Sequence, residues 1–592
     1  MTHRRSESRK RNPAAAAVYA DAAPRPWVYV LSAVAAVLLV FWAYWPAIDG
    51  PFLFDDIGFS SRALSPAAWL HGVRPVLGFT YWINSRISQD TTYSYHVFNL
   101  MVHCFAGGAI LLIVRRLLEF SGAEASRCNS LAAFAALLFL LHPAQTESVA
   151  YLAGRSEALS DGLALVAFAV FLCRRTRPIT ASPTTTSPIT ASPITWTRAI
   201  AISALFAAAL LTKQQTIVLP ALLLMTDYYW NPGFTFEGIR SNWRLYVPMA
   251  VCALGGVAYF WTSIMRASSA GFGLRDFTWY QYFFTQCRAL FVYLGMFLLP
   301  LNLSADWDFP ISRTVWEHGA MLGLLALLAC AGLAWCYRRR FPLASYGYFV
   351  FLLLMAPTSS ILPIRDPVAE RRLYFGMLGL LLILVDGLNR LTAGRKAVSA
   401  ICSLTVLAAA IGTHSRAHVW SGATALWEDT VLKSPNKPRV HFQLGNAYYD
   451  AGQCGLAASE FEKAAQLGPA IRALLVNWAI ASDCLNRPDE ALAKLYQAAA
   501  IQATGHVYSQ IGMIYARQAR WPEALDALAQ AEKLDPSYFM IYFYKGGVHL
   551  ATNQSDAAIE DYQQALALRP DFEPARQGLA RARALGRQGL RP

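Results

Sequence analysis

The stretch that decides the fold is WVYVLSAVAAVLLVFWAYWPAI, residues 27–48, followed after Asp49 by Gly50-Pro51-Phe52-Leu53-Phe54-Asp55-Asp56. The apolar run is long enough to cross a membrane as one helix. Two adjacent carboxylates therefore stand where that helix emerges into water. Charge at a membrane border is costly and tends to be functional, and a carboxylate just above the lipid can take a proton from a hydroxyl that arrives from water. Asp55 and Asp56 are thus candidate catalytic residues, although either one alone could also cap the next helix.

Outward from this stretch, the composition indicates a membrane protein. The chain has 592 residues, of which 55% are hydrophobic, and its mean hydropathy is +0.32. The formal net charge of +14 is explained by basic cytoplasmic loops. We find no basic face interleaved with aromatic residues, so we expect no nucleic-acid partner. The ten cysteines are scattered without CxxC or metal spacing, which predicts neither a disulfide framework nor a metal site with cysteine ligands.

Apolar runs recur up to about residue 414 and predict eleven membrane spans. The segment 281–300 is interpreted as interfacial or re-entrant, because counting it as a span would place the basic clusters Arg338–Arg340 and Arg390–Lys396 outside. The tract 178–195 (PITASPTTTSPITASPIT) predicts a disordered cytoplasmic loop. The predicted regions are a cytoplasmic basic tail over 1–26, a membrane domain over 27–414, a linker over 415–437 and a repeat domain over 438–592.

The repeat domain shows a period near 34 residues that is typical of tetratricopeptide repeats. Its first copy has Leu444, Gly445, Tyr448, Ala457, Phe461 and Ala464, and later copies repeat these positions around Gly512 and Gly546. The fold class is therefore all-α, a polytopic helix bundle followed by a solenoid of about four repeats. On repeat geometry the inner groove presents Phe442, Asn446, Tyr449, Met513, Met540 and Phe543. Such a groove suits an extended peptide, and a docking surface for another subunit is an equally open alternative.

On the predicted topology, charged and polar side chains collect on the outer face of the membrane domain. They are Asp55, Asp56, Arg74, His142, Glu147, Arg155, Lys213, Glu370 and Arg371. Each has a structural alternative; for example, Arg155 could pair with Glu147 or Glu157 to hold helices together. As a set they suit glycosyl transfer from a lipid phosphate: the leaving phosphate needs cations, and the acceptor hydroxyl needs one base. No P-loop or Rossmann fingerprint for a soluble nucleotide is present.

The motifs in chain order resemble the transmembrane and tetratricopeptide-repeat (TMTC) family. They are Phe54-Asp55-Asp56, Arg74-Pro75, Tyr95-His96-x-x-Asn99, His142-Pro143-x-x-Thr146-Glu147, Gly154-Arg155, Lys213-Gln214-Gln215 and Val368-Ala369-Glu370-Arg371-x-Leu373-Tyr374. The resemblance implies a type C glycosyltransferase bundle and protein O-mannosyl transfer from dolichyl-phosphate mannose in the endoplasmic reticulum lumen. It implies Asp55 as the catalytic carboxylate, with Asp56 beside it. Arg155, Lys213 and Arg371 match basic motif positions, and we assign them to the donor phosphate; Arg74, His142, Glu147, Glu370 and Tyr374 are further site candidates.

Three departures from the family pattern bear on the donor and the acceptor. The repeats are fewer than in typical animal members, Lys213-Gln214-Gln215 replaces Lys-Glu-Gln, and no Leu-Pro follows Tyr374. The Ala- and Arg-rich composition suggests a bacterial chain, with the site and repeats on the periplasmic side of the inner membrane and an undecaprenyl-type lipid as donor. In a eukaryote the same side is lumenal. The lipid-phosphate sugar is the expected donor substrate; no cofactor is predicted, and no residue pattern supports a divalent metal, which stays an open alternative. Transfer to a lipid or cell-wall glycan, and a non-catalytic scaffold, remain alternatives.

Overall fold

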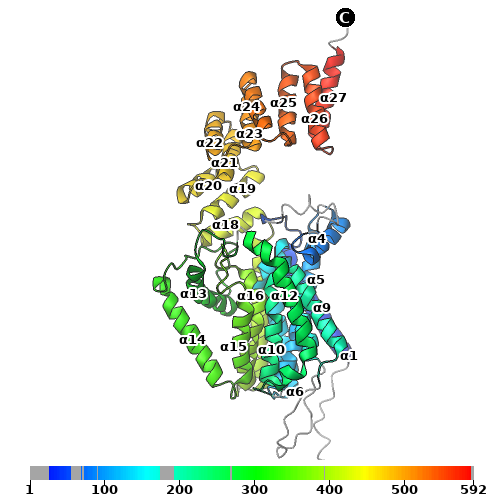
Figure 1. Ribbon diagram of the computed structural model, residues 1–592, viewed down its shortest axis with the longest axis vertical. Helices are drawn as coiled ribbons and strands as arrows, with labels where there is room; N and C mark the ends of the chain where they lie inside the picture. The colour runs from blue at the N-terminus through cyan, green and yellow to red at the C-terminus, as the bar shows by residue number, and fades with distance from the viewer. Residues whose placement is uncertain are drawn as a thin grey trace, which may run out of the picture.

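The computed structural model describes residues 26–54, 56, 69, 72–89, 91–173, 193–231, 233–266, 270–392 and 394–588. These residues form helices and connecting loops, with a single isolated bridge between Ala270 and Ile364 as their only extended pairing. A helix bundle occupies one end of the molecule and a curved array of short helices the other (Figure 1). The prediction of an all-α chain is confirmed. Residues 1–25 of the basic tail, and the predicted disordered loop except for 193–195, lie outside the described residues.

The bundle is built from long apolar helices. They are α1 (Pro26–Tyr44), α5 (Tyr93–Phe120), α6 (Ala125–Leu141), α8 (Arg155–Leu172), α9 (Trp196–Thr212), α10 (Leu219–Trp230), α12 (Trp243–Arg266), α13 (Trp279–Leu298), α14 (Ala320–Cys336), α15 (Pro342–Met355), α16 (Leu373–Arg390) and α17 (Arg395–Val419). By length and composition, six described helices can cross a membrane, and a seventh span is possible if the bent pair formed by α6 and the segment 143–150 counts as one. These helices indicate a multi-pass membrane domain, while the count of eleven spans stays a prediction.

Helix α13 (Trp279–Leu298) covers most of the segment 281–300, which is predicted to be interfacial or re-entrant. Its polar contacts along much of its length go to the loop that precedes α16: Tyr282 donates to Thr358 O (2.5 Å), Gln286 Nε2 to Pro367 O (2.9 Å), and the Ala369 amide donates to Tyr293 Oη (3.2 Å). In Figure 1, α13 lies at the end of the bundle nearest the repeats. A helix that crossed the bundle would leave this loop after one or two turns, so these contacts favour the interfacial interpretation.

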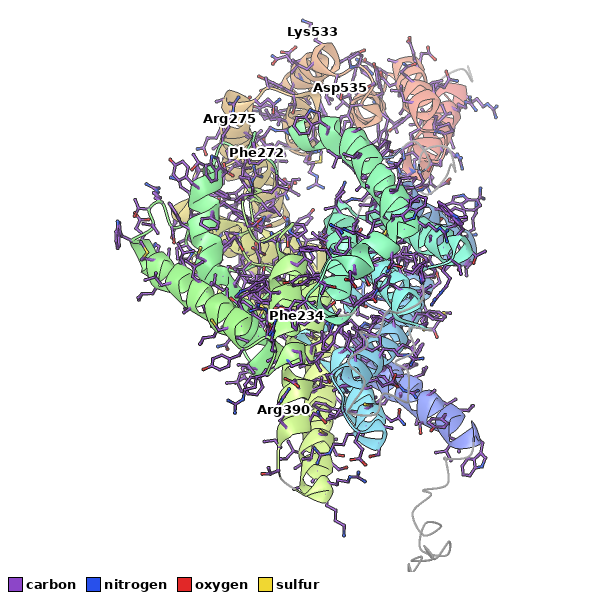
Figure 2. All side chains as sticks on the ribbon, turned by 60° about the horizontal axis from the view of Figure 1, so that its bottom comes forward. Phe234, Phe272, Arg275, Arg390, Lys533 and Asp535 are labelled. Atoms are coloured by element: carbon purple, nitrogen blue, oxygen red, sulfur yellow. A yellow bond between two sulfur atoms is a disulfide. The ribbon has the colours of Figure 1, made fainter. Side chains whose placement is uncertain are left out.

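Close backbone packing fixes helix α16, which begins at the candidate site. A Cβ added to Gly379 would lie 2.4 Å from Phe351 N, and one added to Gly347 would lie 2.7 Å from Gly379 O. Small residues of this kind let membrane helices approach closely, and α15 and α16 thereby pack backbone to backbone. Arg390, at the far end of α16, lies well away from Lys533 and Asp535 of the repeats (Figure 2). The residues just before Leu373 therefore face the repeats.

The repeats form antiparallel helix pairs. Their helices are α19 (Pro438–Asp450), α20 (Cys454–Leu467), α21 (Arg472–Cys484), α22 (Pro488–Ile501), α23 (Gly505–Arg517), α24 (Trp521–Leu534), α25 (Phe539–Ala551), α26 (Ser555–Leu568) and α27 (Glu573–Gln588). A Cβ on Gly445 would meet the Phe461 ring at 2.5 Å, and one on Gly512 would meet Leu528 at 2.6 Å. These are the small and large residues from which the repeats were predicted, so the predicted packing is confirmed.

The cysteine prediction was wrong in one place. Cys454, at the start of α20, and Cys484, at the end of α21, form a disulfide. They lie 30 residues apart in no recognisable spacing motif. Only the antiparallel return of the repeat brings their Cα atoms to 6.1 Å, a separation that a disulfide can span.

The repeats are docked on the membrane domain through the segment predicted as a linker. This segment carries the end of α17 and helix α18 (Ala423–Lys433). The Asp306 carboxylate is almost fully buried and contacts Lys437 and Arg439, whose guanidinium also donates to Asp366 Oδ1 (2.7 Å). A shared apolar core that includes Leu53, Trp427 and Leu444 runs beside these ion pairs. The first repeat is thus held against the loops of the membrane domain by both polar and apolar contacts.

Candidate functional site

The segment 143–154 forms the base of the candidate site at the repeat-facing end of the bundle. After α6 the chain bends by 53° and passes through η4 (Pro143–Gln145), α7 (Thr146–Ala150) and η5 (Leu152–Gly154) into α8. His142 fixes this bend, because its Nδ1 accepts from the Ala144 amide (3.3 Å) and its Nε2 lies 3.0 Å from Phe297 O. A Cβ on Gly154 would lie 2.5 Å from Glu147 O, so only glycine lets the segment fold back on itself. The candidate His142 is therefore a buried positioning residue.

Arg371 lies between two buried glutamates at this segment. The Glu147 carboxylate accepts from the Arg371 backbone amide (2.8 Å) and from its Nη1, and Arg371 Nε lies 3.2 Å from Glu157 Oε1. Both glutamate side chains are 3% exposed, whereas that of Arg371 is 31% exposed. Within the described residues, Arg371 Nη2 has no hydrogen bond. The glutamates hold the guanidinium in place and leave one edge of it directed away from them.

Lys213, at the end of α9, contacts Glu157, and Arg74, just before α4 (Pro75–Ser88), lies beside the residue that follows Lys213. Lys213 Nζ contacts Glu157 Oε1 and lies 3.2 Å from Ser156 Oγ, and Arg74 Nη2 donates to Gln214 Oε1 (3.3 Å). Burial lowers the pKa of Lys213 to about 8; Glu157 raises this pKa, and the positive charges of Arg74 and Arg371 lower it. Three cations, Arg74, Lys213 and Arg371, therefore lie close together. They outnumber the two carboxylates, Glu147 and Glu157, that pair with Lys213 and Arg371.

Arg155 does not join this group. Its side chain is fully buried and donates to four neutral oxygens: Asn99 Oδ1 (2.6 Å), Asn84 Oδ1 (2.7 Å), Tyr95 O (2.9 Å) and Thr80 Oγ1 (3.3 Å). It therefore joins α4 and α5 to α8. The structure does not support the expected contact of Arg155 with a donor phosphate, because its N–H groups are enclosed. Nor does Arg155 pair with Glu147 or Glu157, whose carboxylates are taken by Arg371 and Lys213.

The loop that carries the aspartate pair is tied to the same segment. Asp55 lies outside the described residues. Asp56 is 1% exposed; its Oδ1 accepts from the Ala153 amide (2.8 Å) and its Oδ2 from the Leu53 amide (3.2 Å). Phe54 has a left-handed backbone (φ 50°), which is uncommon for a bulky residue, and its ring packs on Trp427 at 4.6 Å between centroids. Asp56 thus anchors the loop, and Asp55 follows Phe54 directly.

Two further candidates lie apart from the cations. Glu370 is fully buried and faces Arg416 Nη2 at 3.6 Å, and Arg416 also donates to Asp429 of α18 (2.6 Å). The Tyr374 hydroxyl lies 2.9 Å from His103 Nδ1, and His103 Nε2 lies 3.0 Å from Leu140 O. Glu370 therefore faces the helices that lead to the repeats, and Tyr374 is part of the bundle core.

Some of the predicted groove residues line a cavity, whereas others are packed against the repeat cores. Asn446 and Tyr449 of α19 line a cavity of about 350 Å³ together with Phe52, Leu53 and Phe54. In contrast, the Phe442 ring packs on Phe461 (6.0 Å), and that of Phe543 packs on Phe572 (5.2 Å). Met513 packs against a repeat core, and Met540 is half-buried on α25. The predicted groove is therefore most open at its first repeat.

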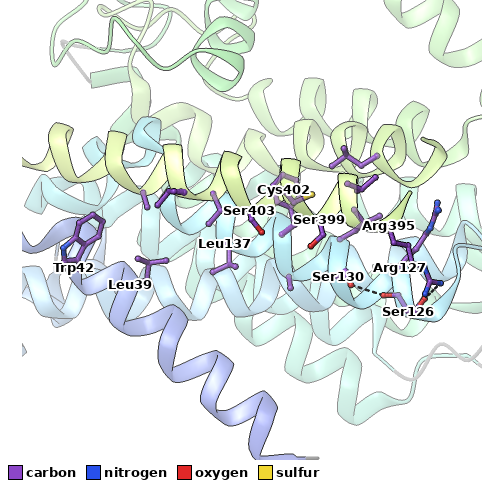
Figure 3. Close-up of a pocket in the computed structure, with 18 residues that line it drawn as sticks. Leu39, Trp42, Ser126, Arg127, Ser130, Leu137, Arg395, Ser399, Cys402 and Ser403 are labelled. Atoms are coloured by element: carbon purple, nitrogen blue, oxygen red, sulfur yellow. Dashed lines mark hydrogen bonds between the residues drawn. The ribbon is translucent and has the colours of Figure 1, made fainter. Parts of the chain in front are cut away.

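A larger groove of about 680 Å³ lies between α1, α6 and α17. Figure 3 shows Arg127 and Arg395 at one end of it and Leu39 and Trp42 toward the other. Arg127 lies near the start of α6, and the candidate site follows the end of that helix, roughly 20 Å away at 1.5 Å per residue. None of the three cations lines this groove. Among the described residues, no three His, Cys, Asp or Glu side chains are grouped to hold a metal ion.

The cations of the site are easier to predict from the sequence than the carboxylates that pair with them. Glu157 was considered only as a partner of Arg155, and Asp161, which accepts from Gln215 Nε2 at 2.8 and 2.9 Å, was not considered. The one usable signal was the polar start of α8, where Arg155, Glu157 and Asp161 interrupt an apolar helix. Nothing in the sequence indicated that Asp306 would meet the first repeat.

Comparisons with known proteins found a family profile, several curated relatives and several solved structures. A profile described as "Tetratricopeptide repeat" matches residues 510–571. The chain is 23% identical over 465 residues to the protein O-mannosyl-transferase F38B6.6 of Caenorhabditis elegans, covering 72% of this chain and 61% of that protein. It is 23% identical over 589 residues to the protein O-mannosyl-transferase TMTC3 of Mus musculus, covering 90% and 59%. The chain thus spans about 60% of the length of these relatives. Among solved structures, YrrB, described as a TPR protein with an unusual peptide-binding site, matches 26% of this chain and 80% of its own with 22% identity and a TM-score of 0.23.

Proposed function

Because this chain is a relative of the TMTC protein O-mannosyl-transferases, we propose that it is a membrane glycosyltransferase. It moves a sugar, mannose on the family resemblance, from a polyprenyl-phosphate donor to Ser or Thr hydroxyls of an exported protein. The repeats bind the acceptor or a partner protein. In a bacterium the donor would carry an undecaprenyl-type lipid.

The observation that carries the proposal is the convergence of Arg74, Lys213 and Arg371 at the repeat-facing end of the bundle. A polyprenyl-phosphate sugar leaves behind a phosphate anion, which needs positive charge rather than a general acid. Arg371 and Lys213 are partly exposed, and Glu147 and Glu157 fix their positions. These two cations, with Arg74, therefore replace the original set of Arg155, Lys213 and Arg371 as the proposed phosphate-binding residues.

The proposed reaction is a single displacement that inverts the anomeric carbon. The acceptor oxygen forms a bond to that carbon while the bond from the carbon to the phosphate oxygen breaks, and the electron pair leaves with the phosphate. The acceptor proton passes to Asp55, because a carboxylate can accept the proton of an attacking hydroxyl. Asp56 positions this loop through the backbone amides of Ala153 and Leu53.

We propose that the site and the repeats face an oxidising compartment outside the cytoplasm. The Cys454–Cys484 disulfide supports this placement, because disulfides persist in such compartments. The positions of Arg338 and Arg390 at the other end of α15 and α16 also support it under the positive-inside bias. The periplasm or the endoplasmic reticulum lumen would meet both conditions.

The test uses the full chain in lipid nanodiscs with a radiolabelled polyprenyl-phosphate mannose. Separate reactions offer a Ser/Thr peptide and a lipid extract as acceptor. We expect label on the peptide with wild-type protein and with Arg395→Ala, which removes an exposed ion pair with Glu124 at the far end of the bundle. We expect greatly reduced label with Lys213→Ala. Label on the lipid fraction alone would show that the acceptor is a lipid or glycan and not a protein. No label in any reaction would contradict the proposed transfer and favour a non-catalytic scaffold.

A further inference from the structure

A cavity lies between the first repeat and the loop that carries the aspartate pair, here called the aspartate loop (residues 50–56, of which Asp55 lies outside the described residues). Its lining combines aromatic, aliphatic and polar side chains. One wall is made by Phe52, Leu53 and Phe54 of the loop and by Trp427 of α18, and the other by α19 and α21 of the repeats. Its volume of about 350 Å³ is within the range of ligand pockets. Two parts of the chain with separate predicted roles therefore share one cavity, and Asp55 is the next residue after its wall.

The repeat wall carries a chain of side-chain amides. Asn477 Nδ2 donates to Asn446 Oδ1 (2.8 Å), and Asn446 Nδ2 lies 3.3 Å from Gln443 Oε1. All three side chains are half-buried and line the cavity. Each amide has two N–H donors and a carbonyl acceptor, so this chain retains hydrogen-bonding capacity on its cavity side. An amide row of this kind matches the alternating N–H and C=O groups of an extended polypeptide.

The charge and the position of the cavity also indicate that an extended polypeptide binds there. Among the described residues that line the cavity, Asp450 is the only charged one, so these side chains offer no cation to a phosphate or another anion. The aromatic wall of Phe52, Phe54 and Trp427 gives apolar contact without selecting one side chain. The docking contacts of Asp306 with Lys437 and Arg439 hold the two walls in register.

We propose that this cavity is an acceptor site that binds the main chain of an extended, unfolded polypeptide segment and delivers its hydroxyls to the aspartate loop. The amides of Gln443, Asn446 and Asn477 bind peptide groups, and the aromatic wall packs on the adjoining side chains. The acceptor is then selected by its unfolded backbone rather than by a sequence motif. This inference rests on the proposed glycosyl transfer, but the binding that it describes is measured without any transfer.

The experiment measures binding of a fluorescent peptide to the full chain in nanodiscs by anisotropy. The probe is a short, unstructured Ala/Ser/Thr peptide, and its N-methylated counterpart serves as a probe without backbone N–H donors. Asn446→Ala/Asn477→Ala should weaken peptide binding by about tenfold or more, since two amide partners are lost from a half-buried site. Gln466→Ala, which removes an exposed amide on the outer helix α20, should leave binding unchanged. The N-methylated peptide should bind wild-type protein about as weakly as the normal peptide binds the double variant.

A second measurement tests the shared wall. A benzophenone at the centre of the bound peptide should form photo-adducts within residues 52–54 and in α19, as mapped by mass spectrometry. Equal binding of the peptide by wild type and the double variant, or adducts confined to other repeats, would overturn the acceptor site. If binding behaves as expected but no sugar is transferred by wild type, the acceptor site stands and the proposed chemistry fails. If sugar transfer proceeds equally in wild type and in the double variant, the chemistry stands and the acceptor site fails.

Discussion

Replacing Arg371 with alanine should separate donor binding from folding. In the structure, Arg371 spans Glu147 and Glu157 and keeps Nη2 outside those contacts. A charge-assisted hydrogen bond to a phosphate is worth about 1.5–3 kcal/mol, and the side chain is 31% exposed, so solvent weakens it toward the middle of that range. About 2 kcal/mol corresponds to a roughly 30-fold weaker donor affinity.

The same substitution has a second effect that must be controlled. Without the guanidinium, the buried Glu147 carboxylate keeps the backbone amide of residue 371 but loses its counter-charge. Leaving a buried charge unpaired is strongly destabilising, by about 3–5 kcal/mol when burial is complete. The double variant Glu147→Gln/Arg371→Ala removes the unpaired charge. We expect it to recover most of the lost thermal stability but not the donor affinity.

The assay is calorimetric titration of nanodisc-embedded protein with a short-chain polyprenyl phosphate, beside thermal unfolding of the same samples. Arg395→Ala serves as the control for removal of an arginine at the other end of the bundle. If Arg371→Ala and the double variant both bind the lipid phosphate as tightly as wild type, Arg371 does not contact the phosphate. The assignment of the cation group to the donor would then be wrong.

Asp55→Asn should lower sugar transfer by about 10²–10⁴-fold with unchanged donor affinity, whereas Asp56→Asn should mainly lower the unfolding temperature, because its carboxylate binds two backbone amides; equal transfer rates for wild type and a folded Asp55→Asn would exclude Asp55 as the base. Burial lowers the pKa of Lys213 to about 8, so its positive charge is lost as the pH rises through that value. Donor affinity should therefore fall above pH about 8 in wild type but stay level to about pH 9 in Lys213→Arg, because arginine keeps its charge. An identical pH profile in both proteins would contradict this. Alkylation of the denatured, unreduced chain should modify eight of ten cysteines, and Cys454→Ser/Cys484→Ser should lower the free energy of unfolding of the repeats by about 3 kcal/mol; labelling of all ten would show that the disulfide is absent.

The sequence by itself determined the features that depend on local periodicity and on length. Apolar runs specify membrane helices because unsatisfied backbone groups are excluded from lipid. The 34-residue period specifies the repeats because each small residue must meet a large one in the paired helix, as Gly445 meets Phe461. The sequence motifs also predict Lys213 and Arg371 as cations of one site, and both contact Glu157.

Only the tertiary structure decided which of the charged residues act together. Arg155 and Glu157 are two residues apart, yet the helix directs them to different partners, four neutral oxygens for the first and two cations for the second. Likewise, Cys454 and Cys484 meet, and the loop 52–54 meets Asn446, through the folding back of segments far apart in the chain. Sequence position fixes the type of a charge and its depth along a helix, but its partner depends on which helix face packs against which neighbour, and that is a property of the assembled bundle.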